Sequence, residues 1–324
     1  MSEQADRLVE RIRREGPIPF DAFVEAALFG DGGFFARARG AGRAGRDFVT
    51  SPEIGPLFGA LLARGLDRWW AELDHPDPFL VVDAGAGRGR LAADVLAAAP
   101  ACAPALRYVL VERSLELRTA QRTLLALEPV EDALGPMVRT DTDAPVPVLG
   151  MGPIASSLPD FPAVHGPGVV VANELLDNLP FRVVERSTTG WMEVRIGADG
   201  RTFVEVVVPA APELAAEADL VAAGVAPEGA RLPVPTGIPD WLLGCAGMLR
   251  GGFLVVVDYV VTAAELVTRG EGGWLRTYRD HERGGSALMT PGEQDITIDV
   301  PREYLVHAAE RAGFRLHQEL TQAE

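Results

Sequence analysis

Lysine is absent from the 324-residue sequence, so all 30 basic residues are arginines, and asparagine occurs only at positions 173 and 178. This bias indicates GC-rich coding, as in many bacteria, rather than a chemical requirement. Positive charge is also scarce, because 46 acidic residues leave a formal net charge of -16. Nucleic-acid binding normally needs clustered basic residues, so DNA and RNA are disfavoured as partners. An acidic surface suits a cationic substrate, and it equally suits a protein that avoids aggregation.

Cysteine and histidine are too sparse to predict a covalent framework or a metal site. Cys102 and Cys245 lie in distant segments, which excludes a disulfide framework and a cysteine metal motif and leaves both as reduced thiols. The five histidines are at least ten residues apart, so no local pair of metal ligands exists and no metal is expected. No apolar run reaches bilayer length, and residues 1–16 lack the apolar core of a secretory signal. We therefore expect a cytoplasmic protein without membrane contact.

The first 78 residues are predicted to form an N-terminal helical cap. Their apolar residues recur at helical spacing, at positions 8, 12, 20, 23, 24, 27 and 28. Ser51 followed by Pro52 is a typical helix start and predicts a helix that ends near residue 71.

From residue 79 the pattern changes to short apolar runs separated by helical segments, which is typical of parallel βαβ units. The clearest strands are predicted at 79–84, 107–112, 168–173 and 252–259, with a weaker one at 136–140. The sequence therefore predicts an α/β fold with a mostly parallel sheet, to which residues 79–180 and 249–324 contribute the two parts of the core.

Residues 181–248 are predicted as an insertion between the two core parts. Three apolar runs separated by glycines at 181–210 predict antiparallel β-hairpins, and 209–236 predicts a surface excursion with one short helix. The second core part is predicted to contain a loop-rich stretch to residue 295. Outside these segments, the patterns predict helices at 238–249 and 301–312 and a strand-like end at 314–320.

The strongest local motif is a strand that ends in Asp83 and continues into three alternating glycines, Gly85, Gly87 and Gly89. Such glycines let a backbone turn sharply and approach a ligand closely. A dinucleotide site would prefer a glycine where Arg90 stands and would disfavour a carboxylate beside a pyrophosphate. Asp83 suits the ammonium of a methionyl group instead, so the loop favours S-adenosylmethionine. A tight turn without a ligand is the alternative.

Glu112 closes the second predicted strand, where an acidic side chain can accept hydrogen bonds from both hydroxyls of a ribose. Nicotinamide-nucleotide sites use the same feature, and a strand-ending glutamate is often only a solvated cap. Its assignment to the cofactor therefore depends on its pairing with the glycine loop.

A second acidic motif, 173–180, follows the strand 168–173 at the end that should face the ligand crevice. Glu174 and Asp177 are three residues apart, a spacing that places two carboxylates on one face of a helical turn. There they could grip a cation, a guanidinium in particular, by charge-assisted hydrogen bonds. The alternative is an acidic first turn that complements a helix dipole after an Asn173 cap.

Asp258 and Tyr259 end the strand after the insertion, at the same edge of the sheet, where Tyr259 is either functional or a core-edge aromatic. The arginines and the tyrosine of 275–279 are expected to be surface or loop-anchoring groups.

These motifs together resemble the MidA family of methyltransferases over nearly the whole chain. The resemblance is carried by GPIPFDAFVEAALF, GGFF, DFVTSPEIGPLFG, VVDAGAGRG, ANELLDNLP, VVDY and PGEQDIT. It implies a class I, Rossmann-like methyltransferase fold with S-adenosylmethionine as cofactor. The mitochondrial members are similar to an arginine methyltransferase that modifies a subunit of respiratory complex I during assembly and makes symmetric dimethylarginine.

Residue by residue, the resemblance assigns roles to three segments of the chain. It implies cofactor binding at Gly85, Gly87, Gly89 and Glu112, a substrate-facing acidic loop at Asn173, Glu174 and Asp177, and a segment covering the cofactor from Asp47 to Glu53.

The sequence departs from the family pattern at three places. Val260 replaces a glycine, and Ile298 and Asp299 replace an Ala-His pair. The sequence also ends early, and we expect it to stop before the last strand of a seven-stranded sheet. The loss of the histidine puts any role for it in doubt.

The resulting hypothesis is methyl transfer from S-adenosylmethionine to an arginine side chain of a partner protein, with Glu174, Asp177 and Asn173 at the acceptor side. The alternatives are methylation of a small molecule, a non-catalytic assembly factor that binds the cofactor, and, more distantly, a dehydrogenase. The oligomeric state is left open.

Overall fold

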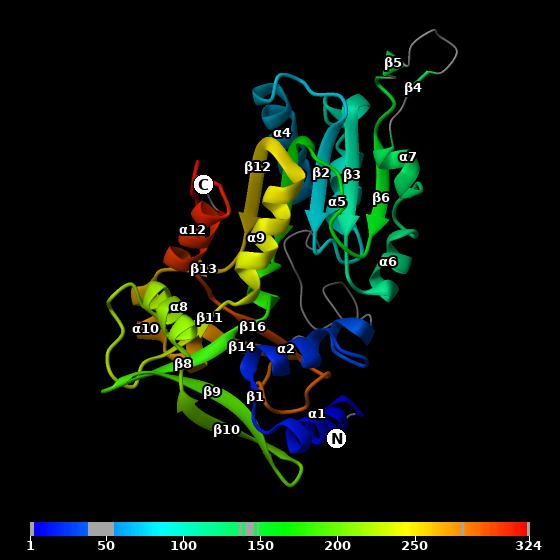
Figure 1. Ribbon diagram of the computed structural model, residues 1–324. Coiled ribbons are helices and arrows are strands. Elements are labelled where there is room, and N and C mark those ends of the chain that lie inside the picture. The colour runs from blue at the N-terminus through cyan, green and yellow to red at the C-terminus, as the bar shows by residue number, and fades with distance from the viewer. Residues whose placement is uncertain are drawn as a thin grey trace.

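The computed structural model describes residues 3–37, 55–135, 138–139, 146–147, 149–279 and 282–322 (Figure 1). Its upper part in Figure 1 is a parallel sheet flanked by helices, and its lower part is an antiparallel sheet against which the N-terminal helices lie. In the described residues, no helix has both the length and the apolar character needed to cross a bilayer. Cys102 and Cys245 are buried free thiols.

The core sheet of the described chain has five strands, all parallel, in the order β12-β7-β2-β3-β6. They are β2 (Phe79–Ala84), β3 (Leu106–Val111), β6 (Ile154–Leu158), β7 (Gly166–Asn173) and β12 (Leu249–Val257). The chain moves outward from β2 to β6 and then returns to the other side of β2. The strand order therefore reverses between β2 and β7, which is where open α/β sheets bind ligands at the carboxyl ends of their strands.

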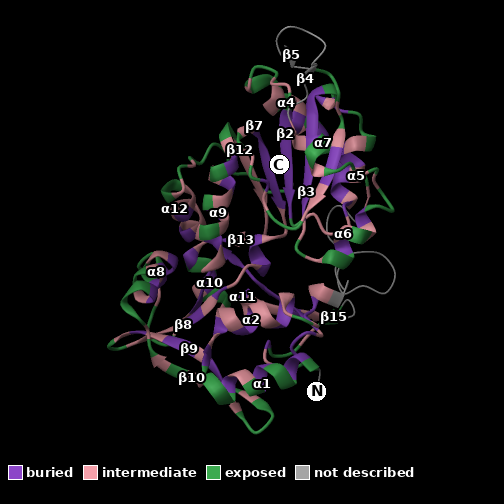
Figure 2. Cartoon of the chain, turned by 45° about the vertical axis from the view of Figure 1, so that its right-hand side comes forward, coloured by how far each residue is buried: buried purple, intermediate pink, exposed green. Residues whose placement is uncertain are grey.

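Strand β2 is buried on both faces, which explains its unbroken apolar run (Figure 2). Phe79 and Val81 pack with α4 (Leu57–Glu72) and α5 (Arg90–Ala97), whereas Leu80 and Val82 pack on the side of α9 (Gly237–Met248). Helices α6 (Leu115–Gln121) and α7 (Val130–Leu134) connect β3 to the outer strand β6. The predicted parallel α/β core is confirmed.

The antiparallel sheet contains the hairpins predicted for residues 181–210. They are formed by β8 (Arg182–Ser187), β9 (Gly190–Asp199) and β10 (Thr202–Pro209), with left-handed glycines at Gly190 and Gly200. Two further strands join this sheet without having been predicted: β1 (Ile18–Pro19) pairs with β9, and β11 (Arg231–Val234) pairs with β8. Helix α8 (Pro212–Ala222) is the predicted short helix of the excursion.

The helices predicted together as an N-terminal cap pack in two different places. The buried faces of α1 (Glu3–Glu15) and α2 (Phe20–Phe29) join the core of the antiparallel sheet, together with the short helix η1 (Phe35–Arg37). Helix α4 instead covers the parallel sheet. It begins at Leu57, and the predicted cap at Ser51 and Pro52 lies outside the described residues, as does the segment 47–53.

Three expectations for the two parts of the core are wrong. Residues 138–139 (β4) pair with 146–147 (β5) rather than with the core sheet, where β6 takes the outer position instead. Residues 314–320 form no strand, because four of these seven residues are polar or charged and most of them are exposed to water. The stretch expected as loops contains regular elements. They are α10 (Ala263–Arg269), α11 (Glu271–Trp274), β14 (Leu275–Arg279), β15 (Glu282–Arg283) and β16 (Asp295–Ile298).

The last elements that the structure describes are the short strand β17 (Val300–Pro301) and the helix α12 (Arg302–Arg311). Strand β13 (Val260–Val261) pairs with β17, and α12 follows where a helix was predicted.

Replacing Gly168 by alanine tests how closely β7 must approach β2. A Cβ atom at Gly168 would lie 2.2 Å from the Leu80 carbonyl oxygen, so we expect G168A to lower the free energy of unfolding by about 3 kcal/mol. Gly166 begins the same strand, and a Cβ atom there meets nothing within 4 Å, so G166A is the matched control. Urea denaturation compares them, and equal stability of the two variants would contradict the packing described.

Candidate functional site

A cavity of about 250 Å³ opens at the carboxyl ends of the core strands, where the strand order reverses. The glycine loop after β2, the end of β3 and the acidic turn after β7 all contribute to its wall. Figure 1 shows α2 beyond the tips of these strands, so the cavity lies between the parallel sheet and the N-terminal helices. Of the residues singled out in the sequence, the wall contains Asp83, Gly85, Gly87, Glu112, Asn173 and Glu174.

The loop after β2 needs its glycines for backbone geometry. Gly85, Gly87 and Gly89 all have left-handed backbones, with φ of 72°, 54° and 81°. A Cβ atom at Gly85 would also lie 2.8 Å from Leu175 Cδ1, so the loop and the acidic turn are in contact across the strand reversal. The loop is held further by the N–H groups of Gly85 and Ala86, which both donate to the Val111 carbonyl. Gly85 and Gly87 thus lie in the cavity wall, whereas Gly89 lies outside it, and only at Gly87 would a Cβ atom meet nothing within 4 Å.

Glu112 is fixed at the end of β3 by the same loop. Its Oε2 accepts the Gly87 N–H at 3.0 Å, and its Oε1 accepts the Ser114 N–H at 2.8 Å. Burial raises the pKa of Glu112, and these two N–H donors act against that rise. Since each carboxylate oxygen can accept a second hydrogen bond, Glu112 can still receive two hydroxyl groups of a ligand.

Asp83 lies deeper in the wall and is only 2% exposed. The Tyr108 hydroxyl donates to its Oδ2 at 3.2 Å. Burial raises the pKa of Asp83 to about 7, the Tyr108 hydrogen bond opposes this, and the nearby Glu112 charge adds to it. A cationic group of a ligand would therefore find a carboxyl whose charge it can stabilise.

The acidic turn does not have the helical geometry that the spacing of Glu174 and Asp177 suggested. Glu174 has a left-handed backbone with φ of 50°, and the short helix η3 begins only at Leu176 (Leu176–Asn178). The interpretation of the two carboxylates as one helical face is therefore wrong. Asp258 sets the turn instead, because its Oδ2 accepts the N–H groups of Leu175 and Leu176 at 3.2 and 2.8 Å.

The two carboxylates of this turn have different environments. Glu174 is half-buried in the cavity wall, beside Asn173, whose Oδ1 is buried without a hydrogen-bond partner among the described residues. Asp177 is 4% exposed, and in the described part of the chain its Oδ1 also lacks a partner. Burial raises the pKa of Asp177 well above its usual range, and the charges of Asp258, Asp295 and Glu174 add to the rise.

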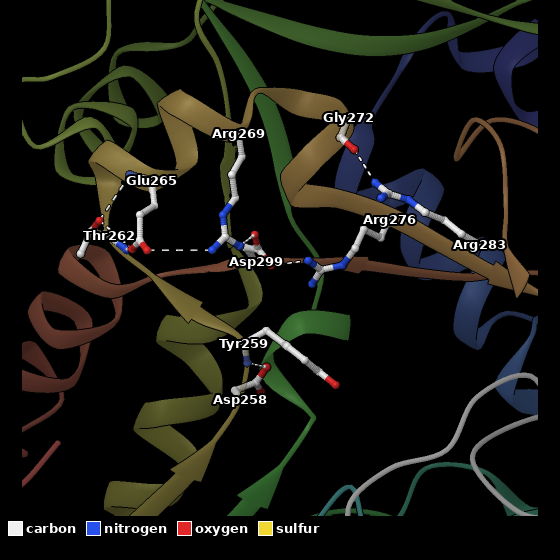
Figure 3. A network of polar contacts seen from close by, with 9 residues as sticks. All are labelled: Asp258, Tyr259, Thr262, Glu265, Arg269, Gly272, Arg276, Arg283 and Asp299. Carbon is white, nitrogen blue, oxygen red and sulfur yellow. Dashed lines mark hydrogen bonds and ion pairs between the residues drawn. The ribbon is translucent and has the colours of Figure 1, made fainter. Parts of the chain in front are cut away.

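Asp258 and Tyr259 belong to the same cluster, as the shared edge of the sheet predicted (Figure 3). Tyr259 is 51% exposed, and the guanidinium of Arg276 lies 5.4 Å from the centre of its ring. Partial burial and the neighbouring carboxylates raise the pKa of Tyr259 to about 12. Arg276, expected from the sequence to be a surface or loop-anchoring group, is partly buried and pairs with Asp299 in the turn between β16 and residues 300–301.

Several cavity residues were missed from the sequence. Phe29 and Phe35 stack on each other with ring centres 5.4 Å apart, and Arg113 lies over Phe29 while its guanidinium pairs with Glu25. Asp160, Phe161 and Trp241 complete the wall on other sides. Only the position of Asp160 after a strand could have drawn notice, and that strand, β6, was itself not predicted.

The sequence matches the model of the family described as "Putative S-adenosyl-L-methionine-dependent methyltransferase" over residues 61–320. The chain belongs to this family. It is 27% identical to the mouse protein named "Protein arginine methyltransferase NDUFAF7, mitochondrial" over 319 residues, which cover 94% of this chain and 69% of the relative. The human protein of the same name is also 27% identical, over 317 residues that cover 94% and 68%.

A solved structure from Burkholderia thailandensis, bound to S-adenosyl-homocysteine, is similar to this chain over almost all of the chain's length. It has a TM-score of 0.77 and 29% identity, and the match covers 96% of this chain and 76% of that one. The chain therefore has the class I, Rossmann-like methyltransferase fold, and S-adenosylmethionine is its cofactor.

The cavity of the methyltransferase fits this cofactor on its own chemistry. The left-handed glycines leave room for close approach, the two remaining acceptor positions of Glu112 suit a pair of ribose hydroxyls, and Asp83 suits an ammonium group. The buried Asn173 Oδ1 is a further acceptor, and it has no hydrogen-bond partner among the described residues.

The pKa of Asp83 predicts how the stability of the cofactor-free protein depends on pH. Because the folded pKa of about 7 exceeds the ordinary 3.8, the folded state holds a proton that the unfolded chain releases between these values. Stability should thus fall as pH rises from about 4 to about 7, by about 4 kcal/mol from this group, and stay level above.

Urea denaturation of D83N across this pH range checks the assignment, because the substitution should remove the fall. In Y108F the loss of the hydroxyl donor should extend the fall to higher pH. A D83N profile that parallels the wild-type profile would exclude Asp83 as its source.

Proposed function

We propose that the protein transfers methyl groups from S-adenosylmethionine to the guanidinium of an arginine side chain in a partner protein. The observation that carries this proposal is the buried Asp177, with an unpartnered Oδ1, beside the cavity-lining Glu174. Buried carboxylates with open acceptor positions suit a guanidinium, which presents up to five N–H donors in a planar fork. The names of the mouse and human relatives, which are protein arginine methyltransferases, support the same acceptor.

On the cofactor side, we assign roles to the residues that line the cavity. Gly85 and Gly87 would let the backbone lie against the cofactor, Glu112 would accept its ribose hydroxyls, and Asp83 would pair with its ammonium group. Gly89 lies outside the wall, and its left-handed backbone would shape the loop. When bound, the cofactor supplies an electrophilic methyl group on a sulfonium centre.

On the acceptor side, the chain must make a guanidinium nucleophilic without first deprotonating it. Because the pKa of a guanidinium lies far above 7, its full deprotonation at pH 7 would cost about 8 kcal/mol. Hydrogen bonds from one side of the guanidinium to Glu174 and Asp177 would concentrate the positive charge there and leave the opposite nitrogen better able to attack. Asn173 would position that nitrogen. Most of the rate enhancement would come from this alignment.

The state of Asp177 before the acceptor binds follows from its environment. Burial and the charges of Asp258, Asp295 and Glu174 raise the pKa of Asp177, and the positive charge of a bound guanidinium would stabilise its ionised form. The nitrogen forms a bond to the methyl carbon while the carbon–sulfur bond breaks, with its electron pair going to sulfur. The proton that the nitrogen then carries in excess passes to a neighbouring carboxylate or to water.

Labelled S-adenosylmethionine identifies the acceptor directly. A lysate incubated with the protein and the labelled cofactor should contain a labelled partner protein, and its digest should yield methylated arginine. Label found only in small molecules would support the alternative of a small-molecule methyltransferase. Absence of any transfer by a protein that binds the cofactor would support a scaffold.

Variants of the acidic turn should separate transfer from cofactor binding. E174Q and D177N each lose a charge that holds the acceptor, so transfer should fall by about 100-fold or more while cofactor affinity stays the same. E310Q, which changes an exposed glutamate on α12, is the control. Calorimetry measures cofactor affinity and radiolabel incorporation measures transfer. Full transfer by E174Q and D177N would exclude both residues from the acceptor site.

A further inference from the structure

Asp299, one of the departures from the family pattern, is a buried carboxylate shared by two arginines. It is 1% exposed, and its Oδ1 pairs with Arg276 Nη1 while its Oδ2 pairs with Arg269 Nη1, both at 2.6 Å. Figure 3 shows the two guanidinium groups approaching Asp299 from different sides, with Tyr259 and Asp258 nearby. The carboxylate thus connects α10 and β14 to the strand ends at the acidic cluster.

The backbone around Asp299 is fixed on both sides. Its own N–H donates to the Trp274 carbonyl at 2.9 Å, and the N–H of Val300 donates to the Tyr259 carbonyl at 2.9 Å. Asp299 is therefore a rigid anchor, and the arginine that it holds has a defined position.

Arg276 is held by this anchor and lies close enough to the acceptor carboxylates for its charge to act on Asp177. Its side chain is 15% exposed, its guanidinium lies against the Tyr259 ring, and its charge lowers the pKa of Asp177. The protein thus has an arginine of its own near the carboxylate proposed to receive the arginine of the substrate. A buried guanidinium that lost its partner would be strongly driven to find another anion, and Asp177 Oδ1 is an acceptor without a partner in the described chain.

We propose that Asp299 is a positioning residue of the acceptor site, which holds the Arg276 guanidinium on its own carboxylate and so keeps Asp177 open to the guanidinium of the substrate. This inference rests on the proposed function, since it needs Asp177 to receive an arginine. Asp299 acts through Arg276 and touches neither the substrate nor the cofactor. Without Asp299, Arg276 would occupy the acceptor position as an internal competitor.

A crystal structure of D299N tests the positioning without any substrate. Arg276 should leave residue 299, and its guanidinium should lie within hydrogen-bond distance of Asp177. Arg276 remaining beside residue 299, or turning to solvent, would overturn the proposal.

Peptide binding tests the competition. The probe is acetyl-Gly-Arg-Gly-amide, titrated by NMR in the presence of S-adenosylhomocysteine, with acetyl-Gly-Lys-Gly-amide for comparison. D299N should bind the arginine peptide about tenfold more weakly than the wild type, because Arg276 must be displaced first. D299N/R276M should recover affinity to within about threefold, because the competitor is gone. A double variant as weak as D299N would show that Asp299 acts in another way.

The matched control is R269M, which removes the other ion pair of Asp299 and leaves Arg276 in place. R269M should lower the melting temperature without lowering the affinity for the arginine peptide. If R269M lowers this affinity as much as D299N does, Asp299 contributes only general stability. D299N/R276M carries no uncompensated buried guanidinium, so it keeps the test open if D299N does not fold.

The two proposals fail in different ways. If the wild type does not prefer the arginine peptide over the lysine peptide, the arginine acceptor and the competition both fall, while the D299N crystal structure still shows whether Asp299 holds Arg276. If the preference holds and D299N binds the arginine peptide as the wild type does, only the role of Asp299 falls.

Discussion

The parallel pairing of β7 between β2 and β12 is the constraint on which the rest of the molecule depends. Backbone groups of these strands approach so closely that Gly168 and Gly252 have no space for a side chain. This pairing places the end of β2, with its glycine loop, beside the end of β7, with its acidic turn. Because the strand order reverses between β2 and β7, the connections that leave the two strands run to opposite sides and leave a cavity at the strand ends.

Electrostatics at this reversal follow from burial rather than from net charge. Asp83 and Asp177 are buried and Asp258 is partly buried, and burial is the largest cause of the raised pKa of each. The free-energy cost of removing these carboxyl groups from water is offset by fixed hydrogen-bond donors, such as the Tyr108 hydroxyl and the N–H groups of the acidic turn. Cations stabilise the ionised form of carboxyl groups whose pKa is raised by burial, and both the cofactor and a guanidinium carry positive charge.

The sequence predicted features that depend on local pattern and missed those that depend on distant contacts. The runs of β2, β3 and β7 are recognisable because strands buried on both faces are continuously apolar. The apolar run of β12 was recognised as well, although this strand is only partly buried. Strand β6 contains Ser156 and Ser157, and β11 contains Pro233, so neither has the expected composition.

The same limit applied to the candidate site. The glycine loop and Glu112 lie in the predicted place, because a strand followed by alternating glycines is a local signal. No local signal predicts the left-handed backbone of Glu174, because this conformation follows from hydrogen bonds to Asp258, more than 80 residues away in the chain. The pairing of Asp299 with Arg269 and Arg276 likewise exists only once β14 and β16 lie side by side.

Helix α2 belongs to the core of the antiparallel sheet and also to the cavity wall, and this has a consequence for how the molecule can be divided. Its buried residues Phe23 and Val24 pack into the antiparallel sheet, whereas Phe29 at its end forms part of the cavity wall, where Arg113 ties it to the loop after β3. A ligand that fills the cavity would thus contact a helix whose other side packs into the core of the antiparallel sheet. Removing the antiparallel sheet to obtain a minimal catalytic unit would strip α2 of its support and open the cavity to water.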